Sequence, residues 1–410
     1  MDPLDSQARR RFLQFLLASP LAAASARAWA VGAEPSTDPV LLQSAADAVD
    51  VFDFEAMARL RLPAAHWGYL ATGVDGDATL QANRDALAQY ALRVRRMVDV
   101  SEVDPSVELL GTRWETPIVL SPLASQRAFD PAGERATARA ARSRKHLQML
   151  STLSSTAVED VNAERGEPVW YQLYPTDQWE VTRALVARAR AAQCPVLVLT
   201  VDLVGGSNRV ALRRWRRQDA RNCADCHVSD PVSSLAQALR KPMFSDLDVS
   251  AVTDLTPPDI GWGYLARLRG IWPRKLVIKG LVTAQDAELA VQHGVDGIVV
   301  SNHGGRAEDS GRGSIDSLVE VAGAVRRRVP VLVDGGFRRG TDILKALALG
   351  ADAVCIGRPY AWGLAAWGQA GVEAVLDLLR QELLTAMRQA GVRRVAELKP
   401  DLVVDTRRQA

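Results

Sequence analysis

The sequence of 410 residues predicts an α/β chain that folds as a (β/α)₈ barrel. Eight short apolar runs follow one another, helix-compatible stretches separate most of them, and most runs end in polar residues or glycine. Alternating strands and helices are typical of a parallel sheet, and eight such units close into a barrel. We expect the barrel domain to span residues 50–392, followed by a C-terminal tail over residues 393–410.

The apolar runs predict the strands, because short runs bounded by turn residues are typical of buried parallel strands. They lie at Pro117–Pro122, Leu147–Ser151, Val169–Tyr174, Pro195–Asp202, Leu276–Lys279, Gly297–Asn302, Val331–Gly335 and Ala353–Gly357. The expected helices lie at Gly133–Lys145, Trp179–Ala192, Ala284–Gly294 and Gly340–Gly350. The last two end on a glycine, a common helix stop. A long loop follows the fourth strand.

Polar residues at the strand ends predict a site at the mouth of the barrel, where the carboxyl ends of the strands meet. These residues are Ser121, Ser151, Gln172, Tyr174, Thr200, Asp202, Lys279, His303, Asp334, Gly357 and Arg358. A purely structural barrel would not need polar residues at all these positions. We therefore expect the mouth to bind a cofactor and a substrate.

The segment Asp296–Arg306 is the most informative of these strand ends. His303 can exchange a proton near neutral pH, and Arg306 can clamp a carboxylate with its two-pronged guanidinium. A single histidine can equally be a core or surface residue. The recurrence of polar strand ends favours a role in catalysis.

Two glycine-containing turns predict a phosphate site at the last two strand ends. Asp334–Gly340 offers backbone N–H groups and leads into a helix N-terminus, and Ile356–Pro359 adds a second arginine. Barrels commonly bind phosphate at strands seven and eight.

Four segments together resemble the FMN-dependent α-hydroxy-acid dehydrogenase and oxidase family, which includes glycolate oxidase, lactate oxidase, and lactate and mandelate dehydrogenases. They are Ser301–Arg306, Lys279–Gly280, Asp334–Gly340 and Gln172–Tyr174. The resemblance runs from about Asp50 to about Val392. It implies FMN as cofactor and oxidation of an L-2-hydroxy acid to the 2-oxo acid. A lactate-like substrate is the first expectation, because Ala124 is small and the pocket rim is apolar.

The resemblance also implies residue roles. His303 matches the base, and Asp202 the carboxylate that stabilises its protonated form by raising the histidine pKa. The residues that match substrate-binding positions are Tyr69, Tyr174, Arg209 and Arg306. Those that match cofactor-binding positions are Ser121, Ser151, Gln172, Thr200, Lys279, Ser301, Asp334, Gly336, Arg338, Gly357 and Arg358. No metal site is expected.

The chain departs from the family pattern at the rim of the expected pocket. Leu123 and Asp130 stand where the family usually has threonine and histidine. Leu153 replaces a tryptophan, and Leu203-Val204 replaces Thr-Pro. These changes bear on substrate size and reactivity with oxygen, not on the type of reaction.

Two other interpretations remain open at this point. Another FMN barrel enzyme acting on a phosphorylated substrate would share the phosphate turns, and an exported barrel without flavin could serve as a binding protein. For the oxidoreductase, we expect oxygen, a quinone or a cytochrome as electron acceptor and a homotetramer as assembly.

The N-terminus predicts export. Residues 1–30 resemble a twin-arginine signal peptide, with the arginines at Arg9–Arg11, a short apolar segment at Phe12–Ala26 and a small-residue cleavage site at Ala28–Ala30. Residues 31–49 would be a linker, and the enzyme would work in the periplasm. A basic amphipathic surface helix is the alternative interpretation.

The four cysteines do not form a disulfide scaffold in a chain of this length. Cys194 and Cys355 are expected to be small buried hydrophobes. Cys223, Cys226 and His227 match the attachment pattern of haem c, but the loop has no room for a cytochrome domain. A disulfide or redox pair is the favoured interpretation, and metal binding is a further one.

A net charge of +2 gives no reason to expect nucleic acid as a partner, and 48% hydrophobic residues suffice for a large core. The basic run Arg213–Arg217 lies in the loop after the fourth strand, where related enzymes touch membranes. It either docks on a lipid surface or acidic partner, or forms a solvated face.

Overall fold

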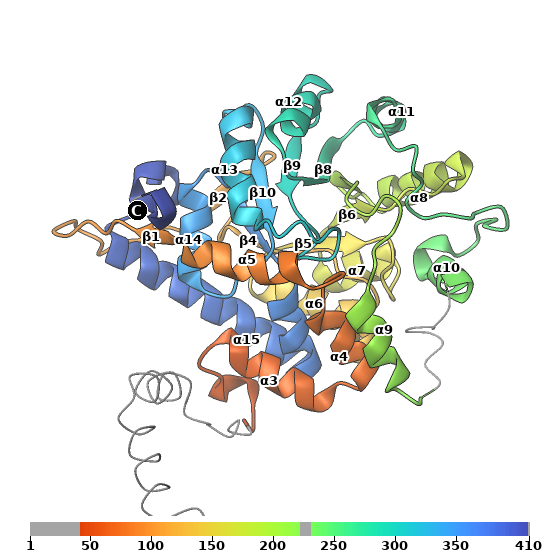
Figure 1. Cartoon of the computed structure of the whole chain (residues 1–410), viewed down its shortest axis with the longest axis horizontal. Helices are drawn as coiled ribbons and strands as arrows, with labels where there is room; N and C mark the ends of the chain where they lie inside the picture. The colour runs from red at the N-terminus through yellow and green to blue at the C-terminus, as the bar shows by residue number, and fades with distance from the viewer. Residues whose placement is uncertain (1–41, 222–230, 409–410) are drawn as a thin grey trace, which may run out of the picture. The chain divides into compact units, whose positions relative to one another are not determined.

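The computed structural model describes residues 42–221 and 231–408, and a closed barrel of eight parallel strands lies at its centre (Figure 1). The strands are β4 (Ile118–Leu120), β5 (Leu147–Ser151), β6 (Trp170–Leu173), β7 (Val196–Thr200), β8 (Lys275–Leu281), β9 (Gly297–Val300), β10 (Val331–Asp334) and β11 (Ala353–Ile356). Neighbours around the barrel follow chain order, and β11 pairs with β4 to close it. Each strand overlaps the run that predicted it, so the (β/α)₈ barrel is confirmed.

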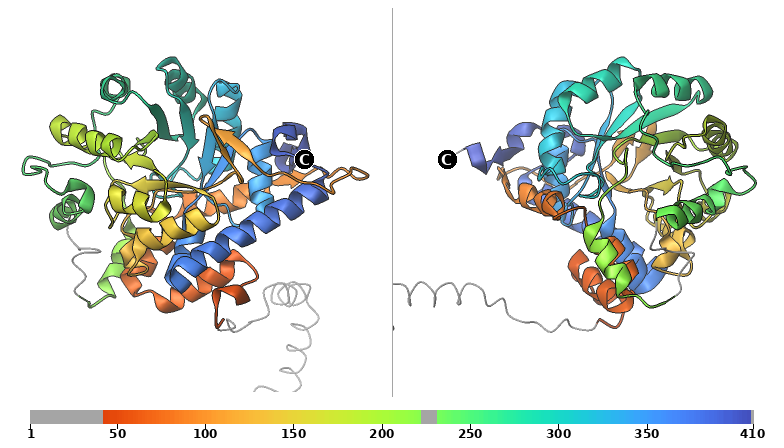
Figure 2. Two further views of the ribbon diagram at one scale, coloured as in Figure 1. Left: turned by 180° about the vertical axis from the view of Figure 1, so that it is seen from behind. Right: turned by 45° about the vertical axis from the view of Figure 1, so that its right-hand side comes forward.

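Helices surround the barrel on its outside (Figure 2). They are α6 (Gly133–Ser143), α7 (Val158–Arg165), α8 (Trp179–Ala191), α12 (Ala284–Gln292), α13 (Ser314–Val325), α14 (Gly340–Ala348) and α15 (Arg358–Ala390). The four predicted helices begin at the predicted residues and end within two residues of the predicted stops. Helix α15 contains a kink, where Trp367 and Gly368 have non-helical dihedrals.

The core has two layers because successive side chains of a strand point to opposite faces. In β5, Leu147 and Met149 join the cluster inside the barrel, whereas Leu150 packs in the cluster between strands and helices. The inner cluster also contains Leu109 from a hairpin of β2 (Val107–Leu109) and β3 (Thr112–Trp114). Leu109 packs with residues at the strand starts, so the hairpin closes that end and leaves the opposite mouth for a site.

Segments before and after the barrel pack together on its outside. A short turn, η1 (Ala45–Asp47), is followed by helices α3 (Val51–Arg61), α4 (Ala64–Ala71) and α5 (Ala78–Ala88). Helix α15 packs on α3 and α6. Strand β1 (Tyr90–Leu92) pairs antiparallel with β12 (Val403–Asp405), so the segment expected as a C-terminal tail is part of the folded domain.

The long connection between β7 and β8 holds three helices over the described residues. They are α9 (Val210–Arg217), α10 (Pro231–Leu239) and α11 (Trp262–Ile271), with the turn η3 (Pro242–Phe244) between the last two. Figure 1 shows α9 beside α4, below the barrel. The long loop predicted after the fourth barrel strand, which is β7, is thus confirmed and carries helices of its own.

Some sequence predictions fall outside the described residues. The twin-arginine signal peptide, most of the linker and the Cys223, Cys226 and His227 motif lie in residues 1–41 and 222–230. Within the described ranges, none of the helices combines the length and apolar character needed to cross a membrane.

Leu332, fully buried inside the barrel, should contribute strongly to stability. Leu332→Ala is expected to lower the free energy of unfolding by about 2–5 kcal/mol, because the truncation leaves a cavity that the barrel cannot close. Urea unfolding followed by circular dichroism measures the change. Leu289→Ala on α12, where the side chain is 36% exposed, is the matched control and should change stability far less. Equal losses for both variants would contradict the two-layer core.

Candidate active site

The polar residues at the strand ends form one layer at the mouth of the barrel, as the strand register requires. Ser151 on β5 is level with Gln172 on β6, and Thr200 on β7 is level with Lys279 on β8. Gln172 Nε2 donates to Thr200 Oγ1 at 3.0 Å. The sequence-predicted residues of these strands are therefore brought together.

His303 lies just after β9 and is held by a carboxylate at one ring nitrogen. Its Nδ1 lies 2.8 Å from Asp202 Oδ1, and its Nε2 lies 3.3 Å from the hydroxyl of Tyr174. An ionised carboxylate only accepts hydrogen bonds, so the network assigns the ring hydrogen to Nδ1. Nε2 therefore carries the lone pair, and the imidazole can accept a proton at that atom.

Burial governs the protonation of this histidine. Burial lowers the pKa of His303 and outweighs Asp202, which raises it, while Lys279 and Arg306 add to the lowering. The sequence-based expectation that Asp202 raises this pKa is right in direction for that pair, but the net shift is downward. His303 is consequently neutral at pH 7 and available as a base.

Lys279 and Asp202 form the charged centre beneath the mouth, with side chains 5% and 4% exposed. Lys279 Nζ donates to Ser301 Oγ at 2.7 Å and lies 3.4 Å from carboxylate oxygens of both Asp202 and Asp334. Burial would lower the pKa of Lys279, but the two carboxylates outweigh it and raise that pKa. Burial would likewise raise the pKa of Asp202, but His303 and Lys279 lower it to about 2. Both groups are therefore charged at neutral pH.

Local backbone geometry brings these groups together. Gly280, which follows Lys279, has φ +115, and a Cβ there would lie 2.6 Å from Asp202 Cβ. Only glycine allows β8 to approach Asp202 so closely. His303 itself has φ +57, a conformation that non-glycine residues seldom adopt outside functional turns.

Two arginines converge on the ring of Tyr69. The guanidinium carbon of Arg306 lies 4.3 Å from the ring centroid, and that of Arg209 lies 5.7 Å from it. Nε and Nη2 of Arg306 are buried, and neither has a hydrogen-bond partner among the described residues. Burial, followed by the charge of Arg306, lowers the pKa of Arg209 to about 9. Because buried cations that repel each other are stabilised by an anion, this pair is suited to a carboxylate.

A pocket next to His303 and Lys279 contains polar atoms that lack partners. It is lined by Ser121, Pro122, Leu123, Lys279, His303, Gly304, Asp334, Gly335, Gly336, Phe337, Arg338, Cys355, Ile356, Gly357 and Arg358. Among the described residues, the buried Ser121 Oγ and Asp334 Oδ1 have no hydrogen-bond partner. Unsatisfied buried polar atoms are costly, and here they point to a polar ligand that completes them.

One end of this pocket is built from glycine turns and two arginines. Arg338 stacks on Trp362, with its guanidinium carbon 4.6 Å from the ring, and burial lowers its pKa to about 10. Arg358 donates from Nη1 to Gly304 O at 2.8 Å and from Nη2 to Thr72 O at 3.1 Å. Two buried guanidiniums beside backbone N–H groups suit a phosphate.

Four predicted cofactor residues lie in the barrel mouth without lining this pocket. Ser151, Gln172 and Thr200 belong to the layer of strand ends beside it. Ser301 is fully buried, and its Oγ accepts from Lys279 Nζ and from the backbone N–H of His303 at 3.0 Å. In this structure Ser301 therefore supports the lysine and the histidine turn.

The sequence interpretation missed residues that come from α5. The amides of Asn83 and Asn302 exchange hydrogen bonds at 3.0 and 2.8 Å, which fixes the turn that carries His303. Arg84 donates to Gly336 O and pairs with Asp342 at 3.0 Å, which holds the glycine turn. Nothing in the surrounding sequence of α5 marks these two residues, because their partners lie more than 200 positions away.

Comparisons with known proteins agree with this arrangement. The profile of the family described as FMN-dependent dehydrogenase matches residues 58–405. A 2-hydroxyacid oxidase of Dictyostelium discoideum is 38% identical over 87% of this chain and 90% of its own length. An L-lactate oxidase of Nostoc sp. is 40% identical over 85% of this chain and 96% of its own. The crystal structure of a mandelate oxidase superimposes with a TM-score of 0.76 at 36% identity, covering 86% of this chain and 97% of that one.

The pKa of His303 provides a direct test of the charged centre. In the wild-type protein we expect an imidazole pKa below 6.5, and Asp202→Asn should lower it further, because the carboxylate is the group that raises it. Histidine NMR across a pH titration measures both values, with His303→Gln to assign the resonance. A pKa that stays the same or rises in Asp202→Asn would contradict the assigned pairing.

Proposed function

Because the chain belongs to the FMN-dependent dehydrogenase family, with 2-hydroxy-acid oxidases as relatives, we propose that it oxidises a small L-2-hydroxy acid, lactate-like in size, to the 2-oxo acid. FMN is the cofactor of this family, and bound FMN supplies the two-electron acceptor for the reaction. The observation that carries the proposal is the convergence of His303, Arg306 and Arg209 beside a pocket with unsatisfied polar atoms.

The residues of the pocket, together with the layer of strand ends beside it, fit FMN in chemical type. Ser121, Gln172 and Thr200 would hydrogen-bond the polar edge of the ring, and Arg338 and Arg358 would hold the phosphate. Asp334, with one carboxylate oxygen free of partners among the described residues, would accept from ribityl hydroxyls. Lys279 places a fixed positive charge in this pocket, which favours a negatively charged reduced cofactor.

The substrate carboxylate would lie between Arg306 and Arg209, near Tyr69. A bidentate guanidinium fixes both the position and the plane of a carboxylate, so the hydroxyl carbon of the substrate is oriented as well as bound. The hydroxyl of Tyr174 lies 3.3 Å from His303 Nε2 and would hydrogen-bond the substrate hydroxyl beside the base.

Nε2 of His303 would accept one proton from the substrate. Its neutral state at pH 7 makes the lone pair available, and the carboxylate of Asp202 then stabilises the imidazolium through Nδ1. Asp202 thus acts after the proton has been transferred, when the imidazole ring of His303 carries a positive charge.

An apolar rim supports a 2-hydroxy acid with an apolar side chain. Leu123 lines the pocket where the family usually has threonine, and Leu153 replaces the family tryptophan. Ala124 adds little bulk, which also leaves room for an aryl group of the kind that mandelate carries. Steady-state rates with glycolate, L-lactate and L-mandelate would rank these substrates.

Oxygen is the acceptor that we propose, because relatives similar to the chain are named as oxidases. The departures Leu153 and Leu203-Val204, expected at the pocket rim, would bear on the access of an acceptor to the cofactor. Reoxidation of the reduced enzyme by oxygen, a quinone or cytochrome c, compared in one stopped-flow experiment, would identify the acceptor. Sedimentation would test the expected homotetramer.

We propose a periplasmic location, and this proposal rests on the N-terminal sequence pattern alone. The order of twin arginines, apolar segment and small-residue site is that of an export signal, and the twin-arginine route carries folded proteins with their cofactors. Fractionation of cells that express the full chain, with Arg9→Lys/Arg10→Lys as comparison, would test it.

Two alternatives give different experimental results. An FMN barrel that acts on phosphorylated substrates would leave the cofactor oxidised with L-lactate and turn over a phosphorylated compound instead. A binding protein without flavin would be colourless when purified.

His303→Gln should separate cofactor binding from chemistry. We expect full FMN content and a rate of anaerobic flavin reduction lowered by about 100-fold or more, because no group remains to accept the proton at that position. Stopped-flow absorbance measures the rate. A variant that still reduces FMN at the wild-type rate would refute the assigned base.

Arg306→Lys should mainly weaken substrate binding, since a point charge cannot reproduce the bidentate guanidinium. We expect KM to rise by about tenfold or more, with loss of orientation also lowering kcat. Arg328→Lys is the control, because Arg328 pairs with Glu288 on the surface. Unchanged KM in Arg306→Lys would remove this arginine from the carboxylate site.

A further inference from the structure

We propose that helices α4 and α9 form a single substrate-positioning unit, in which Trp215 and Asp219 are positioning residues that hold Tyr69 and Arg209 in register. The inference rests on the proposed function, because Tyr69 and Arg209 are the residues expected to meet the substrate. Neither Trp215 nor Asp219 is placed to touch it.

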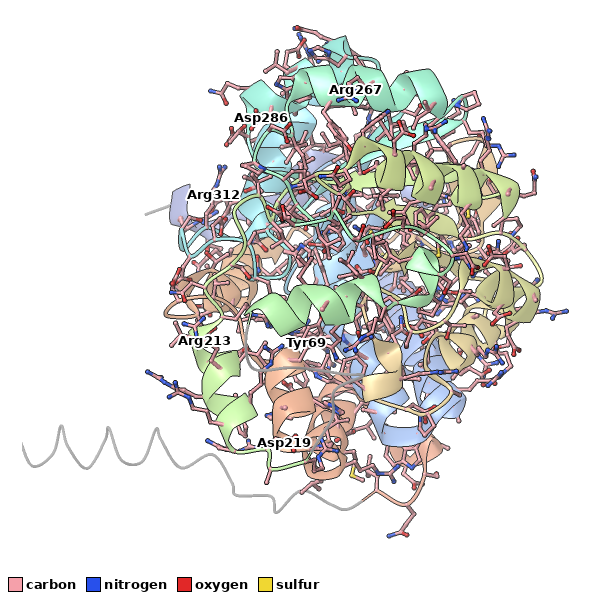
Figure 3. The ribbon with its side chains drawn as sticks, turned by 90° about the vertical axis from the view of Figure 1, so that its right-hand side faces the viewer. Tyr69, Arg213, Asp219, Arg267, Asp286 and Arg312 are labelled. Atoms are coloured by element: carbon pink, nitrogen blue, oxygen red, sulfur yellow. The ribbon has the colours of Figure 1, made fainter. Side chains whose placement is uncertain are left out.

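The two helices lie side by side (Figure 1), and hydrogen bonds at both ends join them in an antiparallel arrangement. At the start of α9, Arg209 Nε donates to Gly73 O at 3.0 Å, just after the end of α4. Beyond the end of α9, Asp219 Oδ2 accepts from the backbone N–H of Ala65 in the first turn of α4 at 3.2 Å. Figure 3 labels Arg213 on α9, Asp219 just beyond the end of that helix, and Tyr69 on the neighbouring α4.

The middle of the pair is a close contact between Trp215 and Gly68. A Cβ on Gly68 would lie 2.4 Å from Trp215 Cβ and 2.6 Å from its Cγ. Non-bonded carbon atoms do not approach each other this closely. The two helices can therefore pack at this distance only because residue 68 lacks a side chain. Gly68 is the residue immediately before Tyr69, so this contact fixes the turn of α4 that presents the tyrosine.

Little of helix α9 is buried. Among its eight residues, Leu212 is the one that is buried. The chain reaches α9 through Gly205 and Gly206, at φ +79 and +82, and a Cβ at either position would meet open space. Because this glycine connection places little constraint on the position of α9, the orientation of Arg209 depends on the contact between α9 and α4.

The electrostatics agree with this arrangement. Arg306 follows β9 and is fixed by the barrel, whereas Arg209 is fixed by α9. Burial lowers the pKa of Arg216, and Tyr69 on α4 partly offsets this shift. Arg216, a residue of the basic run, therefore lies close to α4. A shift between α4 and α9 would therefore change the separation of the two guanidiniums that we expect to clamp the carboxylate.

Gly68→Ala tests the unit without altering a substrate-binding residue. The added methyl group must displace Trp215, so we expect the dissociation constant for oxalate and the KM for the best 2-hydroxy acid to rise by about tenfold or more. Oxalate is a carboxylate probe, and its binding to the holoenzyme is read from the flavin absorbance. FMN content and the melting temperature should stay near the control. Gly270→Ala, on α11 with open space around the new methyl group, is that control.

Trp215→Ala and Trp215→Phe form a second pair. The alanine variant should weaken oxalate binding as Gly68→Ala does, and phenylalanine should largely restore it, because an aromatic ring again fills the contact with Gly68. A loss of folding alone would lower FMN content and kcat per protein but leave the oxalate affinity per bound flavin unchanged. Wild-type oxalate affinity in both Gly68→Ala and Trp215→Ala would overturn the proposal.

The proposed function can fail separately. If the wild-type enzyme does not reduce its flavin with glycolate, L-lactate or L-mandelate, the assigned reaction is wrong. Oxalate binding to the variants would then still decide whether α4 and α9 position a carboxylate site.

Discussion

The carboxylate of Asp202 is the charge on which the mouth of the barrel depends. It is nearly fully buried, and it lies between the imidazole of His303 and the ammonium of Lys279. A buried carboxylate is strongly unfavourable unless partners compensate it. These partners come from adjacent strand ends, so the pairing follows from barrel closure and brings a neutral base and a fixed positive charge to the same pocket.

Around this centre the structure gathers buried arginines. Arg209 and Arg306 flank Tyr69, Arg338 and Arg358 line the pocket beside His303, and Arg358 lies within electrostatic range of the other three. Burial of like charges lowers the pKa of Arg209, Arg338 and Arg358, and this is a cost in the folded state that anions offset. This concentration of buried positive charge suits anionic ligands such as a phosphate and a carboxylate.

Much of the fold could be predicted from the sequence, because barrel strands are short apolar runs and most of them end in polar residues or glycine. The apolar run before His303 predicted β9, and the glycine stops located the ends of α12 and α14 within two residues. The contacts that support the site were harder to predict. Asn83 and Arg84 support the His303 turn and the glycine turn from α5, and Trp215 rests on Gly68 from a distant loop. Such contacts join positions far apart in the chain, and no local pattern marks them.

The sequence by itself determined the kinds of elements, their order, and the residue types available at the mouth, because these depend on local propensity, hydrophobic pattern and motif. Tertiary structure decided which groups meet and what that contact does to them. Asp202 was expected to raise the pKa of His303, and it does, but the surrounding burial turns the net shift downward. Desolvation depends on the atoms that surround a group in space, and most of those atoms come from other segments of the chain.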